Sequence, residues 1–267
     1  MEWVTEYHDS LQEFIGTVAD RAVKHDDGYD AQWHGNTNNV GEALDIAQRG
    51  WQEVRPKVDQ ARSEIMGKVR NFVNLDTTPT WHVAGGVVDM GEFMTGNPEC
   101  MITFPVTEQT TMKRSLRLVL DPGGNASVNA NELATRGAAV ATLLEVLQLM
   151  GFSLEVMIAS PVRGTINGKI YTPVIKANEA GSLVDIDNLM FACGHPAMLR
   201  RMIFTERLQH SRNMGSSVAL DVDALGLHDI DLVMQRAEHR SGSEPDAGWE
   251  PVEWILWALR NLEIPLG

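Results

Sequence analysis

Residues 115–125 read Ser115-Leu-Arg-Leu-Val-Leu-Asp-Pro-Gly-Gly-Asn125, and this stretch decides the fold. Leucine occupies every second position from Leu116 to Leu120, and Val119 makes the opposite side partly apolar. Such a pattern is typical of a strand that is covered on both faces of a sheet. Pro122 and the two glycines after it stop the strand and open a loop. We therefore expect a buried strand with a loop at its carboxyl end.

A helix and a second strand follow this loop. Asn129 is expected to cap the helix, with Glu132 as its capping-box partner, and Gly151 to end it. Residues 153–158 alternate Leu, Val and Ile with other side chains, which predicts a strand. Strand, helix and strand in this order predict a right-handed βαβ crossover with a parallel pair.

The direction of the chain is then expected to reverse. Asn167-Gly168 between two short apolar segments is a strong hairpin signal. Residues 169–176 should therefore run antiparallel to the second strand. Pro173 lacks an N–H, so we expect this third strand at an edge of the sheet.

The rest of the C-terminal part alternates helices and strands. Asp185 is expected to cap a helix, and Pro196 to break it or to begin the next one. Residues 217–222 predict a strand, and residues 230–236 fit a strand or a short helix. Pro251 is expected in the first turn of a terminal amphipathic helix.

The first 110 residues are less regular. Asn39 is expected to cap a short helix that ends at Gly50, and a charged helix should cover much of residues 52–73. Residues 81–106 are rich in Val, Gly and Thr, which predicts short strands or an extended cover.

Composition excludes several classes of protein. The chain has 267 residues and a net charge of −14, with 36 acidic and 22 basic residues, which disfavours nucleic acid as a partner. No apolar run is long enough for a membrane span, and residues 1–20 carry acidic side chains where a secretory signal would be basic and apolar. Cys100 and Cys193 form no CxxC pair, which favours a reducing compartment. We expect a cytoplasmic protein.

The order of the elements from 115 to 235 resembles the von Willebrand factor A (vWA-like) fold. It runs strand, helix, strand, antiparallel edge strand, helix, strand. The resemblance implies an α/β fold, with a doubly wound, mostly parallel sheet and one antiparallel edge strand, in residues 111–267. Residues 1–110 would then form an N-terminal α+β elaboration.

The vWA-like fold also implies a site at the carboxyl edge of the sheet. In that family the first strand ends in a metal-binding Asp-x-Ser-x-Ser motif, whose positions correspond here to Asp121, Gly123 and Asn125. An amide replaces one hydroxyl, and the other is missing. Mg²⁺ or Ca²⁺ would need Asp121, Asn125 and Ser127 together with backbone oxygens or water. The alternative is a strand-to-helix turn in which these side chains satisfy backbone donors.

A second acidic group is also predicted at this edge of the sheet. In vWA-like domains the loop after a late strand brings an additional acidic residue there, and Asp221 and Asp223 occupy such a loop. They belong to a denser cluster with His228, Asp229 and Asp231, whose spacing matches no closed zinc pattern. Alternating acids of this kind are usually solvated.

The whole chain is also similar to a family of tailed-bacteriophage proteins that has no established activity. The stretches that carry this resemblance are Trp33-His-Gly-Asn-Thr, Glu42-Ala, Gly50-Trp51, Val83-Ala-Gly-Gly-Val-Val-Asp89, Gly96-Asn-Pro-Glu-Cys100, Arg136-Gly-Ala-Ala-Val140 and Phe191-Ala-Cys-Gly-His-Pro-Ala-Met-Leu-Arg-Arg201. The resemblance implies a viral origin and supplies no reaction.

No complete catalytic constellation is visible in the sequence. Cys193 and His195 invite a Cys-His interpretation, but their apolar neighbours favour a buried structural thiol. Phosphate-binding loops of the GxxxxGK[ST] and GxGxxG types and a GxSxG elbow are absent.

We therefore expect a phage-encoded, non-enzymatic protein-interaction protein, an adaptor or assembly factor, in the cytoplasm of the infected host. Its partner, from phage or host, would bind the carboxyl edge through Asp121, Gly123, Asn125, Ser127, Asp221 and Asp223. No cofactor is expected, apart from the Mg²⁺ or Ca²⁺ alternative. Two other hypotheses remain open: a virion structural component that forms homo-oligomers, and a divalent-metal-dependent enzyme acting on nucleotides or nucleic acid.

Overall fold

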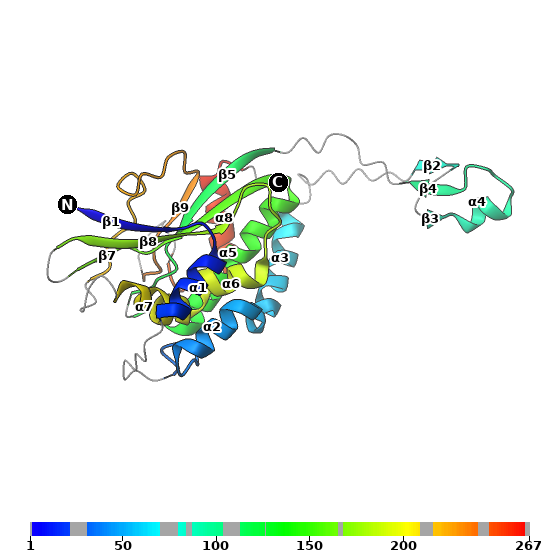
Figure 1. Ribbon diagram of the computed structural model, residues 1–267. Helices are drawn as coiled ribbons and strands as arrows, with labels where there is room; N and C mark the ends of the chain where they lie inside the picture. The colour runs from blue at the N-terminus through cyan, green and yellow to red at the C-terminus, as the bar shows by residue number, and fades with distance from the viewer. Residues whose placement is uncertain are drawn as a thin grey trace.

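A mixed β-sheet with helices on one of its faces forms the main body of this computed structural model (Figure 1). The structure describes residues 2–21, 31–69, 80–83, 87–103, 113–125, 127–164, 168–208, 216–239 and 246–264. The strands of the main sheet are β1 (Trp3–His8), β5 (Lys113–Leu120), β6 (Phe152–Ala159), β7 (Val162–Arg163), β8 (Ile170–Asn178) and β9 (Leu232–Met234). They lie in the order β1-β8-β6-β5-β9, and β7 pairs with β8.

Seven helices belong to this main body within the described residues. They are α1 (Leu11–Arg21), α2 (Val40–Arg49), α3 (Arg55–Val69), α5 (Ala130–Leu149), α6 (Ile186–Gly194), α7 (Phe204–Arg207) and α8 (Pro251–Asn261). A 3-10 turn, Gln52–Val54, precedes α3, and a π-helical segment, Met198–Ile203, leads into α7. None of the described helices has the length and apolar character needed to cross a bilayer.

The predicted βαβ unit is confirmed. Strands β5 and β6 are parallel, and Leu116 to Leu120 pair with Leu154 to Ile158. Asn129 and Glu132 form the predicted capping box, and Gly151 follows α5 with a φ of 88°. The local signals were sufficient here because the cap, the stop and the period of each strand agree.

The strand predicted for residues 169–176 corresponds to β8. It runs antiparallel to β6, as predicted, but its predicted position at the edge of the sheet is wrong. Strand β8 is antiparallel to β6, while β1 adds in parallel on its other side and forms the edge. Pro173 is tolerated because it lies between the last β6 pair, Ala159 with Val174, and the first β7 pair, Val162 with Tyr171. Asn167 of the predicted hairpin lies outside the described residues.

The helices cover one face of the sheet, so the expected doubly wound arrangement is wrong for the described residues. Leu116, Leu118 and Leu120 face a core that includes buried side chains of α1, α2, α3, α5, α6 and α8. Val119 faces the other side, where Leu220 and Leu225 from a loop cover the sheet. Long side chains on a loop replace the second layer of helices.

Two further predictions in the C-terminal part were tested. The strand predicted for residues 217–222 is wrong: Ser217 makes an isolated bridge, and the side chain of Gln235 hydrogen-bonds both the N–H and the carbonyl of Leu220. This amide takes the place of a neighbouring strand. The ambiguous residues 230–236 contain β9, and the terminal helix begins at Pro251 as predicted.

The N-terminal segment contributes directly to the main body. Strand β1 pairs with β8 along its whole length, and Phe14, Val58 and Ile65 are fully buried in the core with α5 and the sheet. Sequence analysis predicted α2 and α3 but missed β1 and α1.

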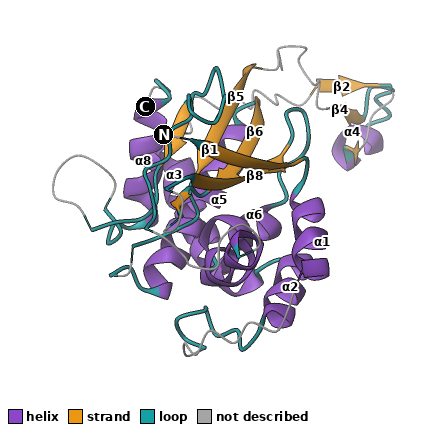
Figure 2. Cartoon of the chain, turned by 60° about the vertical axis from the view of Figure 1, so that its left-hand side comes forward, coloured by secondary structure: helices purple, strands orange, loops and turns teal. Residues whose placement is uncertain are grey.

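A small second unit lies apart from the main sheet in Figures 1 and 2. It contains β2 (Thr80–His82), β3 (Val87–Val88), α4 (Met90–Met94) and β4 (Met101–Thr103), with β4 between β2 and β3. All pairs in this sheet are antiparallel. The short strands predicted for residues 81–106 are thus confirmed in part.

Gly137 of α5 and Gly194 at the end of α6 bring the backbones of two helices close together. A Cβ added to Gly137 would lie 2.5 Å from the Cα of Gly194. Backbone at that distance cannot move aside as a flexible side chain does. Both positions therefore require glycine.

We predict that Gly137→Ala lowers the free energy of unfolding by about 2 kcal/mol or more, because two helix backbones must separate. Urea denaturation measures this change. Gly16→Ala on α1 is the matched control, because no atom lies within 4 Å of its added Cβ, and a helical alanine should stabilise slightly. Equal effects of the two substitutions would contradict the role of the close contact.

Candidate functional site

The carboxyl end of β5 is the topological switch point of the main sheet. Strand β5 lies between β6 and β9 and is parallel to both, so the connections diverge to the two sides here. Open α/β sheets bind ligands at such points. Asp121 follows β5 directly, and its N–H donates to the carbonyl of Met234 at the end of β9. The predicted site residue thus lies at the expected edge.

Asp121 is nevertheless enclosed by protein. The residue is 1% exposed, and its Oδ1 accepts the N–H of Gly123 at 2.9 Å. Burial raises the pKa of the Asp121 carboxyl, whereas the Gly123 N–H, the charges of Arg207 and Arg136, and the Ser160 hydroxyl act in the opposite direction. The carboxyl therefore has four polar neighbours from this chain.

Two buried arginines converge on this edge from different helices. Arg136 of α5 donates to the carbonyl of Gln235 at 2.8 Å, and Arg207 of α7 donates to the carbonyl of Ser160. Burial lowers the pKa of Arg207 to about 10, so its guanidinium stays charged at neutral pH. The two arginines tie the ends of the strands to α5 and α7 and fill the switch point.

Asn125 and Ser127 engage each other. The Asn125 Oδ1 accepts the Ser127 N–H at 3.0 Å and the Ser127 hydroxyl at 2.5 Å, and Ser127 is exposed. These are the bonds of the alternative interpretation, a turn whose side chains satisfy backbone donors. The buried Asp121 carboxyl and the exposed Ser127 hydroxyl therefore lie in different environments, and Gly123 is buried beneath Leu199.

Asp221 and Asp223 belong to the loop that covers the sheet face opposite to the helices. Both residues are exposed, and the Asp221 Oδ1 accepts the N–H of Ala224 at 3.1 Å. Asp221 lines a shallow groove together with Trp3 and Gln235. Asp221 therefore caps a turn and borders that groove.

We predict that Asp121→Asn lowers the free energy of unfolding by about 3 kcal/mol at pH 7, because it removes a carboxylate that interacts with two buried guanidiniums. Thermal and urea denaturation measure the change. Asp221→Asn, on an exposed turn where the amide oxygen can still accept a hydrogen bond, should leave stability unaltered. An Asp121→Asn protein as stable as the parent would show that the carboxyl is already protonated.

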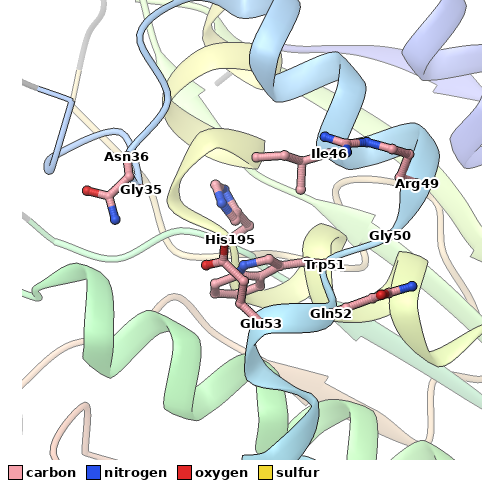
Figure 3. A pocket seen from close by; sticks show the side chains of 9 residues that line it. All are labelled: Gly35, Asn36, Ile46, Arg49, Gly50, Trp51, Gln52, Glu53 and His195. Atoms are coloured by element: carbon pink, nitrogen blue, oxygen red, sulfur yellow. The ribbon is translucent and has the colours of Figure 1, made fainter.

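The sequence analysis did not predict a pocket around His195, which Figure 3 shows from close by. Its volume is about 530 Å³. The lining residues are Gly35, Asn36, Ile46, Arg49, Gly50, Trp51, Gln52, Glu53 and His195. Residues 33–37, 50–51 and 191–201 meet here. All three stretches carry the resemblance to phage proteins, and this shared property was the signal in the sequence that could have indicated the pocket.

Aromatic rings hold His195 in place. Its ring stacks on Phe191 with centroids 5.1 Å apart and meets Trp51 edge-on at 4.5 Å. Its Nδ1 accepts the N–H of Ala197 at 3.0 Å, so the ring proton resides on Nε2. Burial lowers the pKa of His195 to about 4. At neutral pH the pocket wall therefore carries a neutral imidazole.

Cys193 does not act with this histidine as a nucleophile. Burial raises the pKa of the Cys193 thiol to about 12, and the residue is 1% exposed. The thiolate is the nucleophilic form, so a thiol with such a pKa is inert at neutral pH. The expectation of a buried structural thiol is confirmed.

We predict that stability falls as the pH is lowered from about 6.5 to 4. Between these values the unfolded His195 binds a proton and the folded one does not, so the free energy of unfolding rises with pH and the histidine contributes about 3 kcal/mol over the window. Denaturation of the parent and of His195→Asn across this range isolates the contribution, because His8, whose pKa burial also lowers, is common to both. Parallel stability curves would contradict this assignment.

The small unit presents an apolar surface. Nine large apolar side chains are exposed among the described residues, and six of them lie between positions 81 and 94. They are Trp81, Val83, Val88, Met90, Phe93 and Met94. We call this set the α4 surface. Sequence analysis noted that residues 81–106 are rich in Val, Gly and Thr, but it did not predict exposed apolar side chains there.

A family model described as a domain of unknown function (DUF7192) matches residues 1–245. The match covers both the small unit and most of the main body. No curated protein and no solved structure matches the chain.

Proposed function

Because the chain belongs to the DUF7192 family, whose description assigns no function, we propose one from the geometry: a non-enzymatic adaptor or assembly protein that binds another protein through the α4 surface. The main body serves as the scaffold that carries this surface. The carboxyl edge, which the sequence analysis favoured for the partner, is occupied by Arg136 and Arg207.

The concentration of exposed apolar side chains in one small unit carries the proposal. Phe93 is 58% exposed and Met94 is 78% exposed, and the side chains described in residues 81–101 include no buried one. Isolated exposed apolar residues are ordinary, but several together mark a binding surface. Aromatic residues and methionine are also the types enriched at protein interfaces.

Charge indicates the kind of partner. Residues 80–103 contain Asp89, Glu92 and Glu99 but no lysine or arginine. Acidic side chains close in sequence to exposed apolar ones complement a protein cleft with basic borders, and they are repelled by anionic lipid and nucleic acid. A basic, apolar cleft on a protein from the host or the phage is the proposed target.

The vWA-like fold and the phage origin are part of the same proposal. The order β8-β6-β5-β9, the reversed β8 and an aspartate directly after β5 support a vWA-like variant with a degenerate metal loop. Among the described residues, helices cover only one face of the sheet, and this departs from that family. Action in the infected cell follows from the sequence resemblance.

The test is a pair of surface variants of the full-length protein. We predict that Phe93→Ser combined with Met94→Ser weakens capture of the partner at least tenfold, because exposed aromatic anchors carry much of the binding energy. Quantitative pull-down from cells that make the protein, followed by affinity measurement with the purified partner, gives the readout. The melting temperature should not change, since neither side chain is buried.

Leu183→Ser is the matched control, because Leu183 is 87% exposed and lies far from the α4 surface in sequence. Equal binding by the double variant and the parent would overturn the proposal. Light scattering distinguishes a different protein from a second copy of this chain as the partner. Loss of an oligomer in the double variant identifies a second copy and favours the virion component.

A further inference from the structure

Two residues of the edge strand β1 and one of α7 bring metal-binding atoms together. Glu6 and His8 are two positions apart on β1, so their side chains lie on the same face. Glu206 belongs to α7. One ligand atom from each of the three lies within 4.8 Å of the others, and no other such group of three occurs among the described residues.

The group is buried, which distinguishes it from a cluster of surface acids. Glu206 is 1% exposed and His8 is 5% exposed. The Nε2 atom of His8 is buried and has no hydrogen-bond partner among the residues that the structure describes. A buried polar atom without a partner costs free energy, and such an atom in a native fold calls for a ligand or water.

A small space lies against Glu6 and Glu206. Its volume is about 10 Å³. It is lined by Val4, Glu6, Tyr171, Thr172, Pro173 and Glu206. A space of this size holds roughly one water molecule or one ion.

Two guanidiniums lie near these carboxylates. Arg21 approaches both, with its Nη2 3.1 Å from Glu6 and its Nη1 4.0 Å from Glu206. The charge of the buried Arg207 also acts on Glu206. Arg21 is the last residue of α1, and its side chain is 34% exposed, so it can turn outwards.

We propose that Glu6, His8 and Glu206 form a binding site for a divalent transition-metal ion, with Zn²⁺ as the preferred ion. One imidazole and two carboxylates suit Zn²⁺, and Mn²⁺ should bind the same set more weakly. Ligands of a tetrahedral zinc ion lie about 3.4 Å apart, so small side-chain rotations close the set. The fourth position is left for water.

The ion would fasten the edge strand to the helical layer. Strand β1 is bonded to the sheet on one side only, and the site links its inner face to α7. An ion that binds only the folded chain raises its stability. The inference concerns the main body and does not depend on the proposed role of the α4 surface.

Calorimetric titration of chelator-treated full-length protein with Zn²⁺ tests the site. We expect one ion per chain, an upward shift of the melting temperature, and affinity at least tenfold weaker in Glu206→Gln and in His8→Asn. His239→Asn is the control, because His239 lies 3.6 Å from Glu132 and from Asp246 in an exposed group that should not hold the ion. Unchanged affinity in both ligand variants, or loss in the control alone, overturns the proposal.

Arg21→Met provides an independent measurement if a ligand variant fails to fold. Removing the competing guanidinium should tighten Zn²⁺ binding at least threefold, and equal or weaker binding contradicts the site. Replacing Zn²⁺ by Co²⁺ reports the ligands directly. We expect weak d–d absorption without a thiolate charge-transfer band; such a band would assign the ion to Cys100 or Cys193 and overturn the inference.

Discussion

The buried ionic group at the end of β5 is the constraint on which the arrangement of the main body depends. Asp121 leaves the central strand, and the two arginines near it come from α5 and from α7. Burial of three ionisable groups costs free energy unless each has partners, so the strand ends and both helices must take fixed relative positions. For the same reason, the edge around Asp121, which the sequence analysis predicted as a ligand site, has a structural role.

Helix α5 makes both a close glycine contact with α6 and a polar contact with the edge of the sheet. This helix is buried on nearly every side: Gly137 allows α6 to approach at backbone distance, and Arg136, its neighbour, reaches the sheet edge. The pocket around His195 lies just beyond the end of α6, where the chain turns at Pro196. Close packing and the position of the pocket are therefore consequences of one helix pair.

The α4 surface is exposed, whereas the proposed metal-binding group of Glu6, His8 and Glu206 is largely buried. The surface exposes apolar side chains in a small unit whose described side chains in residues 81–101 include no buried one, and the proposed metal-binding group buries polar atoms beneath the edge strand. Each departs from the usual rule of apolar inside and polar outside, and such departures accompany binding more often than folding. A partner protein would cover the exposed apolar side chains, and a metal ion would bind the buried polar atoms.

Local signals in the sequence determined the βαβ unit, the capped helices and the reversal after β6, because caps, stops and periodicity act between residues near one another. Strand β1 was missed because its polar residues, Glu6 and His8, interrupt the apolar pattern that would have shown it. The edge position of β8 and the strand at 217–222 were wrong because the pairing of β1 and the side chain of Gln235 come from distant segments. The sequence also placed Asp121 at the sheet edge, but only the tertiary structure decided its burial, because arginines 15 and 86 residues further along the chain supply its partners.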